Sequence, residues 1–120
     1  MATVTLTSEN FEQTVADHEM VLVDFWAGWC GPCRMFAPIY EEASEAHPDI
    51  VFGSIDTEDQ RELSAAAQVR SIPTLMAFKK GHLVFSQPGA LPAAALTQVI
   101  DALVALDVDA ALAKAADQQR

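Results

Sequence analysis

Residues 20–34 read Met20-Val-Leu-Val-Asp-Phe-Trp26-Ala-Gly-Trp-Cys30-Gly-Pro-Cys33-Arg34, and they contain the clearest structural signal in the sequence. Residues 20–26 form an almost continuous apolar and β-branched run, which is typical of a strand buried on both faces of a parallel or mixed sheet. After Cys33 the apolar residues recur at helical spacing until His47-Pro48-Asp49, at Phe36, Ile39, Tyr40 and Ala43. The two cysteines are therefore expected where a strand meets a helix.

The position of each cysteine suggests its chemical role. Cys30 is expected to open the helix, where unpaired backbone amides and the positive end of the helix dipole stabilise a thiolate. Cys33 lies three residues on, on the same helical face, close enough to close a small disulfide ring. We therefore expect Cys30 to be the exposed nucleophile and Cys33 the resolving thiol. Gly31 lets the chain turn without a Cβ clash, and Pro32 presets the helical φ angle.

The Cys-x-x-Cys spacing alone is also compatible with half of a zinc site or with a structural disulfide. Zinc needs two further ligands, and His18, His47 and His82 lie on separate segments without ligand spacing. A tryptophan directly before the first cysteine is an unusual surface for an inert bridge. The pattern therefore favours redox chemistry without a metal.

Strands and helices alternate along the rest of the chain. Strands are expected at residues 3–6, 50–55, 74–78 and 83–85, and helices around residues 11–15, 63–67 and 96–103. Ser8 is the expected N-cap of the first helix, and residues 57–60 fit a capping box for the third. Lys79 and Lys80 would lie at the solvated tip of the hairpin. This order predicts a three-layer α/β sandwich with a mixed sheet.

The composition bounds the size and the partners of the protein. With 120 residues, 51 % of them hydrophobic, the chain has room for one compact domain. We expect residues 1–106 to form this domain and residues 107–120 to be a short C-terminal extension, helical or frayed.

The formal net charge of −10 argues against the basic surface that nucleic acids and anionic lipids require. Residues 1–60 carry 12 acidic residues and a single base, whereas residues 61–120 carry 5 acids and 6 bases.

The N-terminal sequence and the longest apolar runs bear on location. The first eight residues lack the charged and apolar regions of a secretory signal. No apolar run approaches the roughly 20 residues that span a bilayer. We therefore expect a cytoplasmic protein with no membrane partner, in a reducing compartment that keeps both thiols available.

The segment from Trp26 to Arg34 resembles the active-site segment of the thioredoxin family almost letter for letter. Further landmarks stand at the spacings of that family: Asp24, Pro38, Ile72-Pro73-Thr74, Gly81 and Gly89. The resemblance covers residues 3 to 106 or so. It implies a thioredoxin fold, a three-layer α/β/α sandwich with a central mixed five-stranded sheet and about four helices.

Asp24 is the only charged residue in the apolar run, so burial should raise the pKa of its carboxyl toward neutrality. An exposed strand end is the alternative position for this residue. The resemblance implies that Asp24 accepts a proton from the resolving cysteine. Many thioredoxins have a lysine near this carboxyl, at a position that we assign to Ser54 here. Because Ser54 supplies no countercharge, we expect a larger pKa shift than in the lysine-containing relatives.

The resemblance also implies where a substrate docks. An X-Pro bond is cis in only about 5 % of cases, but the family pattern implies a cis Ile72–Pro73 bond with the Ile72 backbone opposite Cys30. The free N–H and C=O of Ile72 would then pair with an extended client segment. A shallow apolar groove around the sulfur would be lined by Trp29, Ser71, Gly89 and Ala90.

The resemblance implies a thiol–disulfide oxidoreductase that reduces disulfides in client proteins through a reversible Cys30–Cys33 dithiol/disulfide. It further implies a monomer without bound cofactor, which receives electrons from NADPH through a flavoprotein, thioredoxin reductase. Two alternatives remain open. The first is a binding or chaperone-like module that uses the groove without turnover, and the second is a dedicated redox partner of a single client, with residues 107–120 as its specialisation.

Overall fold

The computed structural model describes residues 2–118, so Met1 of the expected domain and the last two residues of the extension lie outside the described residues. Within this range the elements follow in the order β1 (Thr3–Thr5), α1 (Phe11–Asp17), β2 (Met20–Trp26), α2 (Gly31–Ala46), β3 (Val51–Asp56), α3 (Arg61–Ala66), β4 (Thr74–Lys79), β5 (His82–Pro88), α4 (Ala93–Ala105) and α5 (Val108–Gln118). The alternation of strands and helices expected from the sequence is present.

The central strand of the sheet is β2, which is parallel to β3 and antiparallel to β4. β1 lies parallel beside β3, and β5 lies antiparallel beside β4, which gives the strand order β1-β3-β2-β4-β5. The expected mixed five-stranded sheet is therefore confirmed. Residues 20–25 are all buried, as a strand with neighbours on both edges and helices on both faces requires.

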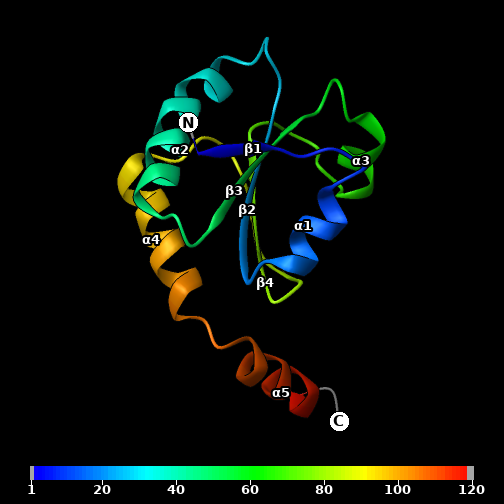
Figure 1. Cartoon of the computed structure of the whole chain (residues 1–120), viewed down its shortest axis with the longest axis vertical. Coiled ribbons are helices and arrows are strands. Elements are labelled where there is room, and N and C mark those ends of the chain that lie inside the picture. Colours follow the sequence, from blue (N-terminus) through cyan, green and yellow to red (C-terminus); the bar gives the residue numbers. More distant parts are fainter. Residues whose placement is uncertain (1, 119–120) are drawn as a thin grey trace.

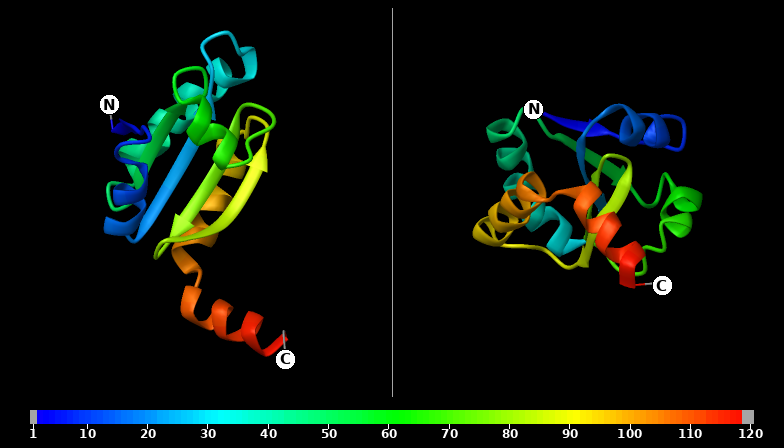
Figure 2. Two further views of the ribbon diagram at one scale, coloured as in Figure 1. Left: turned by 90° about the vertical axis from the view of Figure 1, so that its right-hand side faces the viewer. Right: turned by 90° about the horizontal axis from the view of Figure 1, so that it is seen from below.

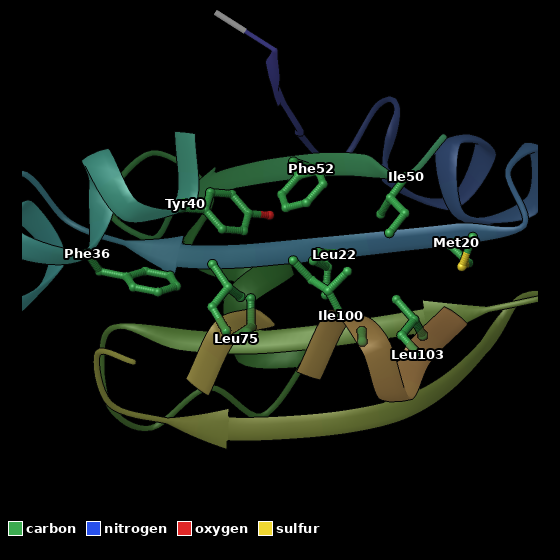
Figure 3. Packing of buried hydrophobic residues seen from close by; sticks show 11 residues of the cluster. Met20, Leu22, Phe36, Tyr40, Ile50, Phe52, Leu75, Ile100 and Leu103 are labelled. Carbon is green, nitrogen blue, oxygen red and sulfur yellow. The ribbon is translucent and has the colours of Figure 1, made fainter. Parts of the chain in front are cut away.

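Helices cover both faces of the sheet, with α2 and α4 on one face and α1 and α3 on the other (Figure 1). The core on the α2 and α4 face contains Leu22 of β2 and aromatic side chains from α2 and β3 (Figure 3). Tyr40 on α2 contacts Phe52 on β3 with ring centroids 5.2 Å apart, and its hydroxyl donates to the Gly53 carbonyl at 2.7 Å. These contacts fix α2, and with it the cysteine pair, against the sheet.

The fifth helix, α5, lies where the sequence left a helix or a frayed end open, and it exceeds the expected count of about four. Figure 2 shows that α5 projects away from the sandwich. Val108 at its start is buried, and Asp109 pairs with Lys80 at 3.2 Å.

Among the described residues, none of the helices combines the length and the apolar character that crossing a bilayer requires.

The expectation that Lys79 lies at a solvated hairpin tip is wrong. Lys79 is 5 % exposed, and its Nζ donates to the carbonyls of Leu103, Val104 and Leu106 at 2.6 to 2.9 Å. These carbonyls lie at and just beyond the end of α4, where, among the described residues, only the Leu103 carbonyl also accepts from a backbone amide, that of Leu106 at 3.3 Å. Lys79 therefore caps the C-terminus of α4 and ties it to β4, whereas Lys80 is exposed as expected.

The expected N-cap of the first helix is also wrong. α1 begins at Phe11, and its N-cap residue is Asn10 rather than Ser8. The Asn10 side chain accepts from the Thr7 amide at 2.7 Å and donates to the Thr5 carbonyl at 3.2 Å. Asn10 thus uses its side chain to close the turn after β1, and α1 begins two residues later than an N-cap at Ser8 would place it.

Replacing Lys79 tests its role as a cap. We expect Lys79→Met to lower the free energy of unfolding by about 2–4 kcal/mol, because three hydrogen bonds to a charged group are lost and the Val104 and Leu106 carbonyls lose the ammonium that they accept from. The matched control, Lys80→Met, removes an exposed ion pair and should cost less than about 1 kcal/mol. Urea unfolding monitored by circular dichroism measures both values. Equal losses in the two variants would contradict the capping role.

Candidate active site

The cysteine pair sits at the strand-to-helix junction, as the sequence predicts. β2 ends at Trp26, the Cys30 amide donates to the Ala27 carbonyl at 3.2 Å, and α2 begins at Gly31. Cys30 is the N-cap residue of α2, and its Sγ accepts a hydrogen bond from the Cys33 amide at 3.2 Å. A sulfur that accepts from the first turn of a helix is placed to carry negative charge when reduced.

The two cysteines form a disulfide, with Cα atoms 5.2 Å apart. The sequence predicts that Cys30 is exposed, but both cysteines are buried: Cys30 is 4 % exposed and Cys33 is 3 % exposed. The reason is packing: both belong to a small apolar cluster with Ala27, against which Trp26 and Ile72 pack. What distinguishes Cys30 is its position at the N-cap and its proximity to the loop that carries Ile72.

The Ile72–Pro73 bond is cis, as the resemblance implies. The Ile72 carbonyl oxygen lies 3.8 Å from the Cys30 Sγ atom, so the loop before β4 faces the disulfide. Gly89 adopts φ +101°, in the left-handed region that favours glycine, and its amide donates to the Pro73 carbonyl at 2.7 Å. The segments before β4 and after β5 are thereby held together beside the cysteines.

The expected groove residues are brought together only in part. Trp29 is 68 % exposed and lines one cleft together with Ser71 and Ile72. Gly89 is tied to the loop that carries Pro73, and the exposed Ala90 follows it, but neither lines this cleft. The cleft instead extends from Trp29 toward α3.

Asp24 lies in the buried centre of β2 and is 5 % exposed. Among residues 2–118, its Oδ1 atom has no hydrogen-bond partner. Burial therefore raises the pKa of the Asp24 carboxyl from 3.8 to about 7. Asp24 is two residues from Leu22, so it lies on the sheet face that α2 covers, the helix that carries the buried Cys33. The alternative of an exposed strand end is excluded.

Ser54 lies beside Asp24 on the neighbouring strand. The parallel register of β2 and β3 pairs Asp24 with Ser54, so both side chains point to the same face of the sheet. Burial is the cause of the pKa shift of Asp24, and among residues 2–118 no cation opposes it. At the register position beside Asp24, Ser54 carries a neutral hydroxyl.

The turn that joins β3 to α3 contributes contacts that the sequence did not indicate. Thr57 donates to the Trp26 carbonyl through its amide at 2.8 Å and through its hydroxyl at 2.9 Å, so the capping box expected at residues 57–60 does not form. The Trp29 indole N–H donates to the Glu58 carboxylate at 3.3 Å. Thr57 and Glu58 thus fix the end of β2 and the exposed tryptophan. Their composition resembles any polar turn, so only the fold reveals them.

Acidic, histidine and cysteine side chains do not gather elsewhere in a way that suggests a metal site. Within the described part of the chain, no group of three such residues could hold a metal ion. Both sulfurs of the pair are joined to each other.

Comparison with known proteins agrees with this geometry. The family model for thioredoxin matches residues 2–102. A putative thioredoxin 2 from Streptomyces coelicolor is 58 % identical over 118 residues, which cover 98 % of this chain and 88 % of that protein. The chain belongs to the thioredoxin family. A thioredoxin from Alicyclobacillus acidocaldarius is 48 % identical over 84 residues, which cover 69 % of this chain and 80 % of its own.

Solved thioredoxin structures share the same fold. A mutant thioredoxin from Halobacterium salinarum superposes with a TM-score of 0.81 at 31 % identity, covering 88 % of this chain and 93 % of that one. The thioredoxin of Plasmodium falciparum gives a TM-score of 0.76 at 36 % identity, covering 81 % and 95 %. This thioredoxin family member is a thiol–disulfide oxidoreductase whose redox-active disulfide joins Cys30 to Cys33.

The unusual pKa of Asp24 predicts a pH-dependent stability. The folded carboxyl binds its proton more tightly than the unfolded one, so its stabilising contribution is full below pH 3.8 and is lost as the pH rises through about 7. We expect the free energy of unfolding of oxidised Asp24→Asn to gain about 3–4 kcal/mol relative to wild type between pH 4 and pH 8. Urea unfolding across this range measures the difference. Parallel curves for the two proteins would contradict the shift.

A countercharge placed at Ser54 should lower the pKa of Asp24. In Ser54→Lys, the ammonium would favour the ionised carboxylate, so the carboxyl titration followed by NMR should move below the wild-type midpoint of about 7. Ser54→Gln is the neutral control and should leave the midpoint near its wild-type value. An unchanged titration in the lysine variant would refute the role that we assign to the missing charge.

Proposed function

We propose that this protein reduces disulfides in client proteins by a two-step thiol–disulfide exchange. The Cys30 thiolate attacks one client sulfur, forms a mixed disulfide and releases the other client sulfur as a thiolate. The Cys33 thiolate then attacks Cys30 Sγ, which releases the second client thiolate and leaves the Cys30–Cys33 disulfide. Two electrons pass to the client. The observation that supports this cycle best is the Cys30–Cys33 disulfide at the N-terminus of α2, opposite Ile72.

Asp24 is the proposed proton acceptor for Cys33. The resolving thiol must lose its proton before it can attack, and a carboxyl with a pKa of about 7 exchanges protons readily near neutrality. Asp24 lies under the helix that carries Cys33 and has an oxygen without a partner among the described residues. Gly31 and Pro32 keep the two cysteines in the first turn, where exchange between them needs little rearrangement.

The proposed docking edge for clients is the backbone of Ile72. Its carbonyl faces Cys30, and the neighbouring Trp29 is largely exposed. An extended client segment can pair with a backbone edge without reading side chains, which suits an enzyme with many clients. Ser71, Pro73, Gly89 and Ala90 complete this docking surface in our proposal.

The proposed electron source is NADPH, delivered through the flavoprotein thioredoxin reductase to the same two cysteines. We place this cycle in the cytoplasm and assign it to residues 1–106, with residues 107–120 as an appendage that the chemistry does not need. The support for these assignments is family membership, together with the distance at which α5 stands from the sandwich (Figure 2).

A coupled assay tests the roles of the two cysteines. With NADPH, thioredoxin reductase and a disulfide-containing protein, the wild type should oxidise NADPH continuously. Cys33→Ser should stop turnover and accumulate a mixed disulfide at Cys30, because the resolving thiol is missing, and mass spectrometry detects that adduct. Cys30→Ser should form no adduct and show no turnover.

Each part of the proposal has an outcome that would contradict it. Equal turnover in wild type and Cys33→Ser would refute the resolving role. No turnover in wild type would remove the reductase from the proposal. Full biological activity in Cys30→Ser would favour a binding or chaperone-like module.

A further inference from the structure

A cleft of about 320 Å³ opens directly beside the docking edge. Trp29 and Ile72 form the part of its wall that belongs to the redox site. The rest of its wall comes from α3, from the turn before it and from the segment that leads into the loop with Pro73: Thr57, Glu58, Arg61, Ser64, Ala65, Val69, Arg70 and Ser71. A client segment that lies along Ile72 therefore passes the mouth of this cleft.

The charges in the cleft differ from those of the whole chain. The protein has 17 acidic and 7 basic residues, yet this cleft holds two arginines and one acid. The acid, Glu58, is already engaged, because it accepts from the Trp29 indole at 3.3 Å and pairs with Arg61 at 3.6 Å. Arg70 is exposed and, within residues 2–118, makes no side-chain hydrogen bond or ion pair. The cleft thus presents one uncompensated guanidinium.

Arg70 is placed to contact a client bound along Ile72 rather than the Cys30 sulfur. Arg70 is two residues before Ile72, whose carbonyl lies 3.8 Å from Cys30 Sγ. Extended chains advance about 3.3 Å per residue, so a client residue two or three positions from its reacting cysteine comes level with Arg70. The guanidinium offers a planar pair of donors that matches a carboxylate.

We infer that this cleft is a specificity subsite for an acidic client side chain, with Arg70 as the residue that binds its carboxylate; the inference rests on the proposed reduction of client disulfides. The overall charge of −10 disfavours acidic clients at long range. Arg70 reverses that preference locally, at a distance too short for salt to screen fully. Trp29, held by Glu58, forms the apolar wall against which the methylenes of the acidic side chain pack.

Paired peptide substrates test the subsite without the reductase. Each peptide has one intramolecular disulfide, and the pair differs only by Glu or Gln, placed two or three residues before or after the reacting cysteine. The measurement is the second-order rate constant for oxidation of the chemically reduced protein. We expect wild type to react roughly three- to tenfold faster with the Glu peptide at one of these placements.

Four variants assign that preference to Arg70. Arg70→Gln should reduce the Glu-to-Gln rate ratio to about one, and Arg70→Lys should retain part of it because the charge remains. Glu58→Gln should raise the ratio, since it removes the negative charge from the cleft and releases Arg61, while the glutamine oxygen can still accept from Trp29. Lys114→Gln makes the same change in net charge on α5, far from the cleft, and should leave the wild-type ratio intact.

The outcomes separate this inference from the proposed function. If wild type reduces the Glu and Gln peptides at equal rates at every placement, the subsite is refuted and the exchange cycle stands. The same holds if Arg70→Gln keeps the wild-type ratio, or if Lys114→Gln lowers it as much as Arg70→Gln. If wild type reduces none of the peptides, the exchange cycle fails, and the subsite fails with it.

Discussion

The antiparallel pairing of β2 with β4 is the constraint on which the site depends. It sets Phe25 opposite Thr74, so the chain leaving β2 and the chain entering β4 meet at the same edge of the sheet. Cys30 and Ile72 are 42 residues apart in sequence, yet this register brings the sulfur of one within 3.8 Å of the carbonyl of the other. The cleft that contains Trp29 and Arg70 lies beside the same meeting point. A shift of this register would separate Cys30 from the Ile72 backbone, which we propose as the docking edge for clients.

The same central strand carries a group that opposes folding. A carboxyl in the middle of an apolar strand costs free energy when it is ionised, and among the described residues the Asp24 Oδ1 atom has no hydrogen-bond partner that would offset this cost. Packing on both faces of β2 outweighs the cost, because residues 20–25 are buried among two clusters of apolar side chains. The fold thus holds a carboxyl with a pKa of about 7 beneath the helix that carries Cys33. In the function that we propose, this local cost to stability provides the proton acceptor for Cys33.

The sequence predicted the features that depend on local patterns. The bounds of β2, the cysteines at its junction with α2 and the burial of Asp24 follow from periodicity and from one charge in an apolar run. Apart from the N-cap of α1, which depends on the local contacts of Asn10, the misses involve contacts between distant segments. Nothing near Lys79 in sequence shows that the carbonyls ending α4 will surround its ammonium. Likewise, the sequence around Glu58 indicates only a polar turn, whereas in the fold its carboxylate accepts a hydrogen bond from the Trp29 indole. Family resemblance supplied the cis bond before Pro73, which local pattern alone does not indicate.

In the cycle that we propose, the desolvated Asp24 carboxyl takes the proton from Cys33 before Cys33 attacks the mixed disulfide. The most direct test follows the rate at which a preformed mixed disulfide between Cys30 and a small thiol is resolved, as a function of pH, in wild type and in Asp24→Asn. We expect an inflection near pH 7 in wild type, together with slower resolution and loss of that inflection in the variant. Superimposable pH profiles in the two proteins would contradict it.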